Sequence, residues 1–313
     1  MSAPVSMAAR VEAYLAMRRQ VGFALTIAGT QLAAFARFAD GLGHRGPLTL
    51  ALAMQWACSS RGRRPLTAAR RIEVLRGFAR YCQRDEPSTE IPPRRLFGPV
   101  HRRLRPHIYT EAEIVRLLAM AKELDPPGGL RGASCAAIIG LMAASGLRIS
   151  EATRLERADV DLELGRLLIR QTKYGKSRWV PLHPTTVDAL TRYASRRDAD
   201  SHAARRTAFF VFDYGRVAST RAVQYAFQLL RRSIGRARGG HPAPRLHDLR
   251  HTFVCQRLAR WYREGRDLDR HVLALSTYVG HAKVTDTYWY VTATPELLAL
   301  AARRVQGAHR SWP

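Results

Sequence analysis

Apolar side chains recur three and four positions apart through residues 7–84, which is the spacing of amphipathic α-helices. One such stripe includes Leu32 and Phe35. Thr67 precedes the last stripe and could cap its helix. The pattern therefore predicts four short helices that form a small all-α domain over residues 1–86.

A proline-rich segment follows this domain. Residues 87–107 contain five prolines, a density that excludes a helix. A linker that needed only solubility could use charges of either sign, so a positive excess favours contact with phosphates. We predict a basic linker that lies along a DNA backbone, with solvation alone as the alternative. Its arginines are Arg94, Arg95, Arg102, Arg103 and Arg105.

A second domain is predicted from residue 108 to residue 313. The spacing of its apolar residues changes once from that of helices to that of β-strands. Two β-like runs, Leu167–Thr172 and Arg178–Leu182, flank a polar turn and indicate a β-hairpin. We predict a mainly α fold, in which the N-terminal helical domain precedes an α-rich domain with a small antiparallel sheet. The predicted helices of this second domain span 111–124, 135–144, 150–155, 185–195, 221–238 and a segment after His247.

Composition adds a large positive charge. The 313 residues include 51 Lys and Arg against 25 Asp and Glu, a formal net charge of +26, while 46% of residues are hydrophobic. The hydrophobic fraction supports folded domains rather than a disordered basic tail. Release of counterions favours a polyanionic partner, so we expect double-stranded DNA, with an anionic membrane surface as the weaker alternative.

Other features point to a reducing compartment. Four scattered cysteines without a CxxC pair do not make a disulfide framework. Residues 1–10 lack the apolar core and cleavage site of a signal peptide, and the apolar stretch Cys135–Leu147 is too short to span a membrane. We expect a cytoplasmic, nucleoid-associated protein and no membrane partner.

Candidate chemistry begins with a histidine and an arginine three residues apart. His247 and Arg250 would share one face of a helix and could hold one phosphate together. His202 and Arg205 repeat the spacing in a polar stretch, which we interpret as coincidence. His247 and His251 also resemble a zinc-protease pair, but the arginine between them would repel a cation, so we predict no metal site.

Two further pairs are candidates. Arg148 follows a glycine after a buried helix, and Glu151 could orient it, unless the two form an ordinary surface ion pair. Lys173 and Lys176 lie at the hairpin tip in a chain with only four lysines. A lysine there could protonate a leaving oxygen, or it could simply be solvated.

The order of these motifs is more specific than any one of them. Gly280-His281 is followed by Tyr288 and Tyr290, and tyrosine can act as a covalent nucleophile. From about residue 108 to residue 300, the chain resembles the tyrosine recombinase (phage integrase) family. The family's spacing from Gly-His favours Tyr290 over Tyr288. The matching residues are Ser145–Glu151, Lys173–Leu182, His247–Phe253, Gly280–His281 and Tyr290.

The resemblance implies a role for each matching residue. Arg148 and Arg250 would clamp the scissile phosphate of DNA. Tyr290 would attack phosphorus, which gives a 3′-phosphotyrosine and a free 5′-hydroxyl. Lys173 would protonate the leaving oxygen, and His247 would act as general base toward the tyrosine.

Four more residues have implied supporting roles. His281 would donate a hydrogen bond to a phosphate oxygen, and Glu151 would support the first arginine or the histidine. Lys176 and Arg178 are predicted to contact DNA. The Val-Pro-Leu after the hairpin tip favours Lys173 rather than Lys176 as the acid.

The same resemblance implies an enzyme that breaks and rejoins DNA strands for integration or transposition of a mobile element. No cofactor is expected, because the phosphotyrosine stores the bond energy. Residues 1–86 would be the core-binding (SAM-like) domain. Four protomers would act on two sites, with an accessory recombinase or DNA-bending protein as a further partner. The stripe Leu297, Leu298 and Leu300 would dock on a neighbouring protomer or on its own domain.

Two other functions use similar residues or the same positive charge. A type IB topoisomerase uses similar chemistry to relax supercoils, and the separate helical domain and short length argue against it. A DNA-binding protein without catalysis could dispense with the tyrosine or one arginine, but all of these residues are present.

Overall fold

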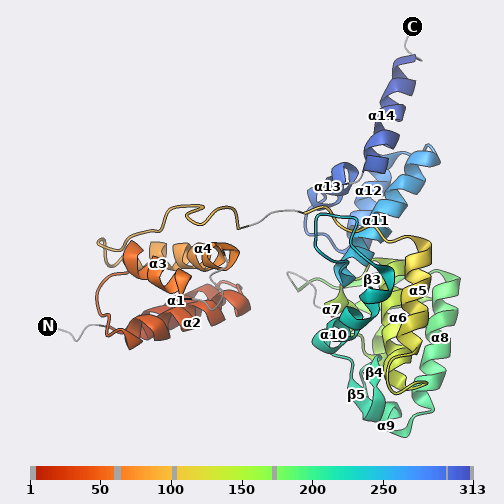
Figure 1. Cartoon of the computed structure of the whole chain (residues 1–313), viewed down its shortest axis with the longest axis horizontal. Helices are drawn as coiled ribbons and strands as arrows, with labels where there is room; N and C mark the ends of the chain where they lie inside the picture. Colours follow the sequence, from red (N-terminus) through yellow and green to blue (C-terminus); the bar gives the residue numbers. More distant parts are fainter. Residues whose placement is uncertain (1–4, 60–64, 101–103, 171–174, 294, 311–313) are drawn as a thin grey trace. The chain divides into compact units, whose positions relative to one another are not determined.

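The computed structural model describes residues 5–59, 65–100, 104–170, 175–293 and 295–310. The chain divides into two compact units, Met1–Arg103 and Leu104–Pro313 (Figure 1). Each unit is described by itself. No helix in the described ranges is long and apolar enough to cross a membrane.

The first unit is a bundle of four helices, as the apolar stripes predict. Phe35 lies at its centre, completely buried, and its ring meets the rings of Trp56 and Phe78 edge to face. The last helix begins at Pro65, a residue suited to the first helical position, so Thr67 lies inside the first turn and does not cap it. The helices are α1 (Met7–Gln20), α2 (Thr26–Gly41), α3 (Leu50–Cys58) and α4 (Pro65–Cys82).

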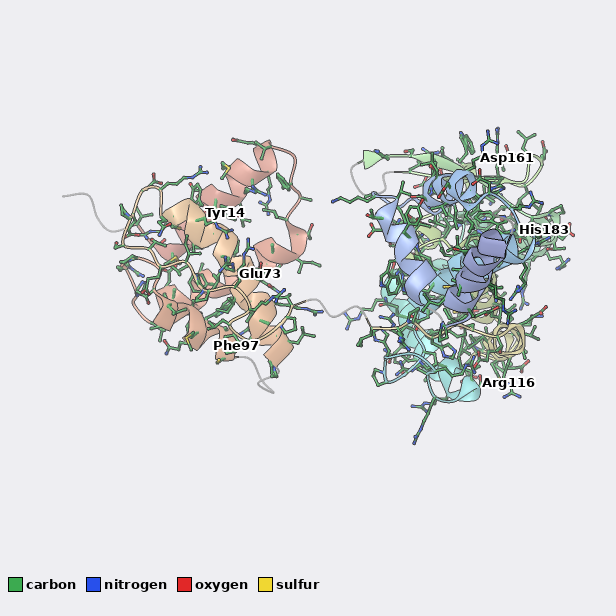
Figure 2. All side chains as sticks on the ribbon, turned by 90° about the horizontal axis from the view of Figure 1, so that it is seen from above. Tyr14, Glu73, Phe97, Arg116, Asp161 and His183 are labelled. Carbon is green, nitrogen blue, oxygen red and sulfur yellow. The ribbon has the colours of Figure 1, made fainter. Side chains whose placement is uncertain are left out.

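The segment that the sequence predicts to be a linker packs on the two units over most of its length. The backbone N–H of Glu90 donates to the Leu48 carbonyl at 2.8 Å, and Phe97 packs against the first core (Figure 2). Further along, the Arg105 carbonyl accepts from the Gly240 N–H at 2.8 Å in the second unit. Described residues at both ends of the predicted linker therefore pack against one unit or the other.

The second unit consists mainly of helices around one extended core. The capping box of Thr110 and Glu113 starts its first helix as predicted. Gly235, with φ of +76°, ends the segment after α10, so the helix predicted over 221–238 is too long; α10 ends at Leu230 and a short 3₁₀ turn follows. The helices are α5 (Glu111–Lys122), α6 (Leu130–Ser145), α7 (Ile149–Ala152), α8 (Pro184–Asp198), α9 (Ser201–Ala204), α10 (Thr220–Leu230), α11 (Leu246–Arg263), α12 (Leu268–Val279), α13 (Thr285–Ala293) and α14 (Pro295–Arg310).

The predicted hairpin is confirmed as part of a three-stranded antiparallel sheet. The strands β1 (Val160–Asp161), β2 (Arg166–Ile169) and β3 (Arg178–Pro181) lie in that order, with Leu167 opposite Val180. Both of these side chains are completely buried, which fixes the register. The two-residue strand β1 was not predicted. A second small sheet pairs β4 (Val211–Phe212) with β5 (Arg216–Val217).

The last helix, α14, packs on α11 and α13 of its own unit near its start. Leu297 is buried in the core that these helices form, and Leu300 packs partly against it. Leu298 is exposed. The apolar stripe at the C-terminus is therefore divided, and most of it serves its own domain.

Candidate active site

A tight turn after α6 positions the first arginine. Gly146 ends the helix with φ of +65°, and a Cβ there would meet the Phe253 ring of α11 at 2.6 Å. Only glycine fits both the conformation and the space. The turn carries the chain directly into α7, with Arg148 at its N-cap.

Glu151 ties two arginines together from inside the protein. Its carboxylate accepts from Arg148 Nη1 at 2.8 Å and from Arg178 Nη2 at 3.0 Å. Burial alone would raise the pKa of Glu151, but hydrogen bonding and charge from Arg178, followed by Arg148, lower it overall. Glu151 is therefore a buried anion that supports Arg148, as the sequence predicts, and also supports a strand residue.

The C-terminal end of α12 holds the same arginines together with Arg250. The carbonyl groups at a helix C-terminus carry partial negative charge and attract cations. Gly280 ends α12 with φ of +70°, and a Cβ there would meet Arg178 Nη1 at 2.7 Å. Arg148, Arg178 and Arg250 donate to the carbonyls of Gly280, Tyr278 and Val279 at 2.9, 2.8 and 2.7 Å respectively.

These three residues, called the arginine cluster from here on, carry more positive charge than their carboxylate partner neutralises. Three guanidiniums and the one carboxylate of Glu151 leave two positive charges. Arg250 is only 1% exposed, and burial followed by the charge of Arg148 lowers its pKa to about 10. A bound anion would relieve this repulsion, so the arrangement suits a phosphate group.

Helix α13 brings Tyr290, and not Tyr288, to the cluster. Tyr290 is 3% exposed, and its Oη lies 2.8 Å from His251 Nδ1. Burial raises the pKa of Tyr290 to about 12, although the charge of Arg250 opposes the rise. Tyr288 is 45% exposed, and its Oη donates to Asp269 at 3.2 Å. The geometry therefore agrees with the spacing argument for Tyr290.

Two histidines contact this tyrosine, and a third contacts one of them. The His281 ring stacks on Tyr290 with 6.0 Å between centroids, and its Nδ1 lies 2.7 Å from Thr287 Oγ1. His247 is exposed, and its ring centroid lies 4.7 Å from that of His251. Removal from water, and then the charge of Arg250, lowers the pKa of both His247 and His281 to about 4.

The contact between His251 and Tyr290 is the feature that the sequence interpretation missed. The motif assigns the tyrosine's partner to His247, one turn earlier on α11. A signal was available, since His251 follows Arg250 directly and lies one helical turn after His247. On the sequence alone, that spacing suggests only a metal-binding pair. No group of three or more metal-ligating side chains occurs among the described residues.

Arg178, which the sequence predicts to contact DNA, has contacts inside the protein. Its side chain is 11% exposed, against 31% for Arg148, and it points toward Glu151 and α12. These contacts suit a residue that positions the cluster. Lys176, two residues earlier, is exposed.

The other predicted residues divide into two groups. Arg94, Arg95 and Arg105 are exposed, as a phosphate contact requires. Lys173, Arg102 and Arg103 lie outside the described residues. His202 lies on α9, at the opposite end of the second unit from α12 and α13 (Figure 1).

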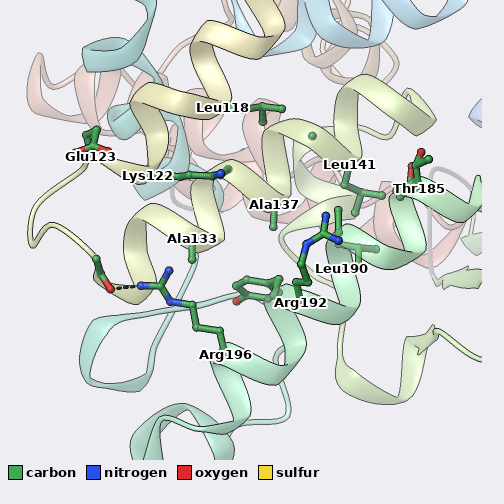
Figure 3. A pocket seen from close by; sticks show the side chains of 16 residues that line it. Leu118, Lys122, Glu123, Ala133, Ala137, Leu141, Thr185, Leu190, Arg192 and Arg196 are labelled. Atoms are coloured by element: carbon green, nitrogen blue, oxygen red, sulfur yellow. Dashed lines mark hydrogen bonds between the residues drawn. The ribbon is translucent and has the colours of Figure 1, made fainter.

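A separate cavity of about 680 Å³ lies between α5, α6 and α8. Apolar side chains such as Leu118 and Leu141 line it, and Lys122, Arg192 and Arg196 stand around it (Figure 3). No residue of the arginine cluster and no tyrosine of α13 lines this cavity. The candidate active site is therefore the cluster at the end of α12 and not the large cavity.

Comparison with known proteins gives consistent matches. The family model described as the phage integrase family matches residues 108–296. A Sinorhizobium fredii protein provisionally named integrase/recombinase y4rB is 38% identical and covers 96% of this chain and 96% of its own length. Tyrosine recombinase XerC of Chlamydia trachomatis is 32% identical over 74% of this chain and 68% of its own length.

A solved structure adds the fold. A lambda integrase tetramer bound to a Holliday junction matches with a TM-score of 0.62. The match covers 92% of this chain and 77% of that one at 17% identity. At this identity the likeness concerns the fold.

Proposed function

Because the chain belongs to the phage integrase family of tyrosine recombinases, enzymes that break and rejoin DNA, we propose that Tyr290 is its nucleophile and the arginine cluster its phosphate site. The observation that carries this proposal is the position of the Tyr290 hydroxyl. It lies beside Arg250, next to the Glu151 carboxylate that Arg148 and Arg178 share. Such a site holds positive charge and a nucleophile next to each other before a phosphodiester binds.

The proposed cleavage step needs only groups of the chain and the DNA. Tyr290 Oη forms a bond to phosphorus while the bond from phosphorus to O5′ breaks, and the proton of the tyrosine hydroxyl passes to a histidine of α11. Arg148 and Arg250 neutralise the charge that grows on the non-bridging oxygens. His281 donates to one of these oxygens, and Lys173 gives a proton to O5′. Attack by a second 5′-hydroxyl on the phosphotyrosine then joins exchanged strands.

Duplex DNA and further copies of the chain are the proposed partners. The net charge of +26 and the exposed Arg94, Arg95, Arg105 and Lys176 support contact with the backbone outside the site. The lambda integrase neighbour is a tetramer on a Holliday junction. We infer a tetramer on two sites in nucleoid DNA, with an accessory recombinase or bending protein where one is needed.

Integration or transposition of a mobile element is the biological role that we infer. It is supported by the integrase/recombinase name of a relative that matches almost the full length of the chain. Relaxation of supercoils by a type IB topoisomerase mechanism is not favoured, since the family match is to integrases.

The test is capture of the covalent intermediate. A nicked duplex that carries the element's own end would be incubated with the full chain in EDTA and run on a denaturing gel. We expect a covalent protein–DNA band with the wild type and with Tyr288→Phe, and none with Tyr290→Phe. A band that survives in Tyr290→Phe and disappears in Tyr288→Phe would assign the nucleophile to the other tyrosine.

A further inference from the structure

The hydroxyl of Tyr290 has a histidine partner that the motif does not assign. His251 Nδ1 lies 2.8 Å from Tyr290 Oη, within the reach of direct proton transfer. The ring contacts of Tyr290 are with His251, His281 and Trp289, whereas the ring contact of His247 is with His251. His251 is therefore the histidine placed to act on the nucleophile.

We propose that His251 is a catalytic residue that accepts the proton of Tyr290 during DNA cleavage. This inference rests on the proposed function of Tyr290. In the step, Oη bonds to phosphorus, its proton moves to His251 Nδ1, and the electrons of the broken P–O5′ bond stay on O5′. The proton that O5′ needs comes from a separate acid, Lys173. In the reverse reaction, His251 returns its proton to the tyrosine as the phosphotyrosine breaks.

The environment of His251 keeps its ring neutral before DNA arrives. Burial, and then the positive or potentially positive groups around it, lower its pKa to about 2. A neutral imidazole has a lone pair available for a proton. The groups that face it are His247, Arg245 and Arg250 from the start of α11, His281 from the turn after α12, and Tyr290 and Trp289 from α13.

DNA binding changes this balance in the direction that the reaction needs. A phosphodiester held by Arg148 and Arg250 would bring a negative charge to the groups that now depress the basicity of His251. The basicity of His251 would rise only when the substrate is in place. In the free protein the proton stays on Tyr290, whose pKa is about 12, so the nucleophile is protected until a phosphate binds.

His247 is placed for a different task. It stands in the first turn of α11 and is exposed, and the charges of Arg250 and Arg148 are among the causes that lower its pKa. It can therefore contact the phosphate that the arginines hold. This division gives each histidine of the motif one partner, the phosphate for His247 and the tyrosine for His251.

The test compares His251→Asn with His251→Ala and with the wild type. Asparagine can place an acceptor oxygen near the position of Nδ1, but it cannot take the proton. We expect covalent-complex formation by both His251 variants to slow by about a hundredfold. At pH values below the pKa of Tyr290, the rate of His251→Asn should then rise about tenfold for each unit of increase in pH, because hydroxide replaces the base.

A second substrate distinguishes loss of the base from loss of the acid. With sulfur in place of the bridging O5′, the leaving group needs no proton, so Lys173→Ala should regain its cleavage rate. His251→Asn should remain slow on this substrate, since it lacks the other proton transfer. Rescue of His251→Asn by sulfur, or a wild-type rate for this variant on the oxygen substrate, would overturn the inference. A wild type that forms no covalent complex would instead overturn the proposed function.

Discussion

Glu151 lies 3.0 Å from Arg178, although Arg178 belongs to the strand that follows the hairpin tip and Glu151 to a helix 27 residues earlier. The pair connects the sheet to the turn that carries Arg148. Because the same arginine also donates to the Tyr278 carbonyl at 2.8 Å, it fixes the end of α12 against the sheet. The arginine cluster is thus assembled by three separate parts of the second unit.

Replacement of Arg178 by glutamine should therefore affect stability more than DNA affinity. The change leaves Glu151 buried with only Arg148 as its charged partner, and loss of one member of a buried pair costs about 3 kcal/mol. Thermal unfolding should show the loss. The exposed Lys176→Gln is the matched control: we expect an unchanged melting temperature and a smaller dependence of DNA binding on salt. If Arg178→Gln kept its melting temperature and showed a smaller dependence of DNA binding on salt, Arg178 would be a DNA contact.

The buried carboxylate of Glu151 should also give stability a defined dependence on pH. Its pKa is lower in the folded protein than in the unfolded chain, so the stabilisation is complete above the unfolded value, about 4.3. It is lost as the pH falls from there through the folded value. Urea unfolding of wild type and Glu151→Gln should therefore differ most at neutral pH. A difference that grows toward acid would contradict this assignment.

The sequence predicted which residues meet, but not how each is used. Arg148, Arg250, His281 and Tyr290 come together as the motif order implies, since spacing along helices determines which face each occupies. The inward direction of Arg178 depends on the approach of β3 to α12, which are far apart in the sequence. Helical period alone likewise cannot say which histidine of α11 meets a side chain from α13.

Substitution of Gly280 by alanine should displace the arginine cluster in addition to straining the backbone. Positive φ costs any residue with a Cβ about 1 kcal/mol, and here the Cβ would also meet Arg178 Nη1 at 2.7 Å. Gly265 is the matched control, with φ of +66° after α11 and no atom within 4 Å of the Cβ position. We expect similar thermal destabilisation from backbone strain in both variants, but slower covalent-complex formation only in Gly280→Ala. Equal cleavage rates would mean that the cluster tolerates the shift.

Arg148 and Arg250, the two arginines proposed to bind the phosphate, should differ in their effects on stability. Arg250 is 1% exposed and donates to the Gly146 and Val279 carbonyls, so Arg250→Gln should cost about 2–3 kcal/mol through unpaired buried groups. Arg148 is 31% exposed, and its loss leaves Glu151 with Arg178 as a partner and relieves the repulsion of Arg250. Arg148→Gln should therefore change stability by less than about 1 kcal/mol.

Both variants should nevertheless reduce cleavage about a hundredfold or more, because each removes a charge placed for the transition state. Urea unfolding without DNA and covalent-complex formation with DNA measure the two effects separately. If Arg148→Gln unfolds as easily as Arg250→Gln, then Arg148 holds the fold together and is not reserved for the phosphate. Unchanged stability with lost cleavage would instead mean that the protein keeps this exposed charge in place for its substrate.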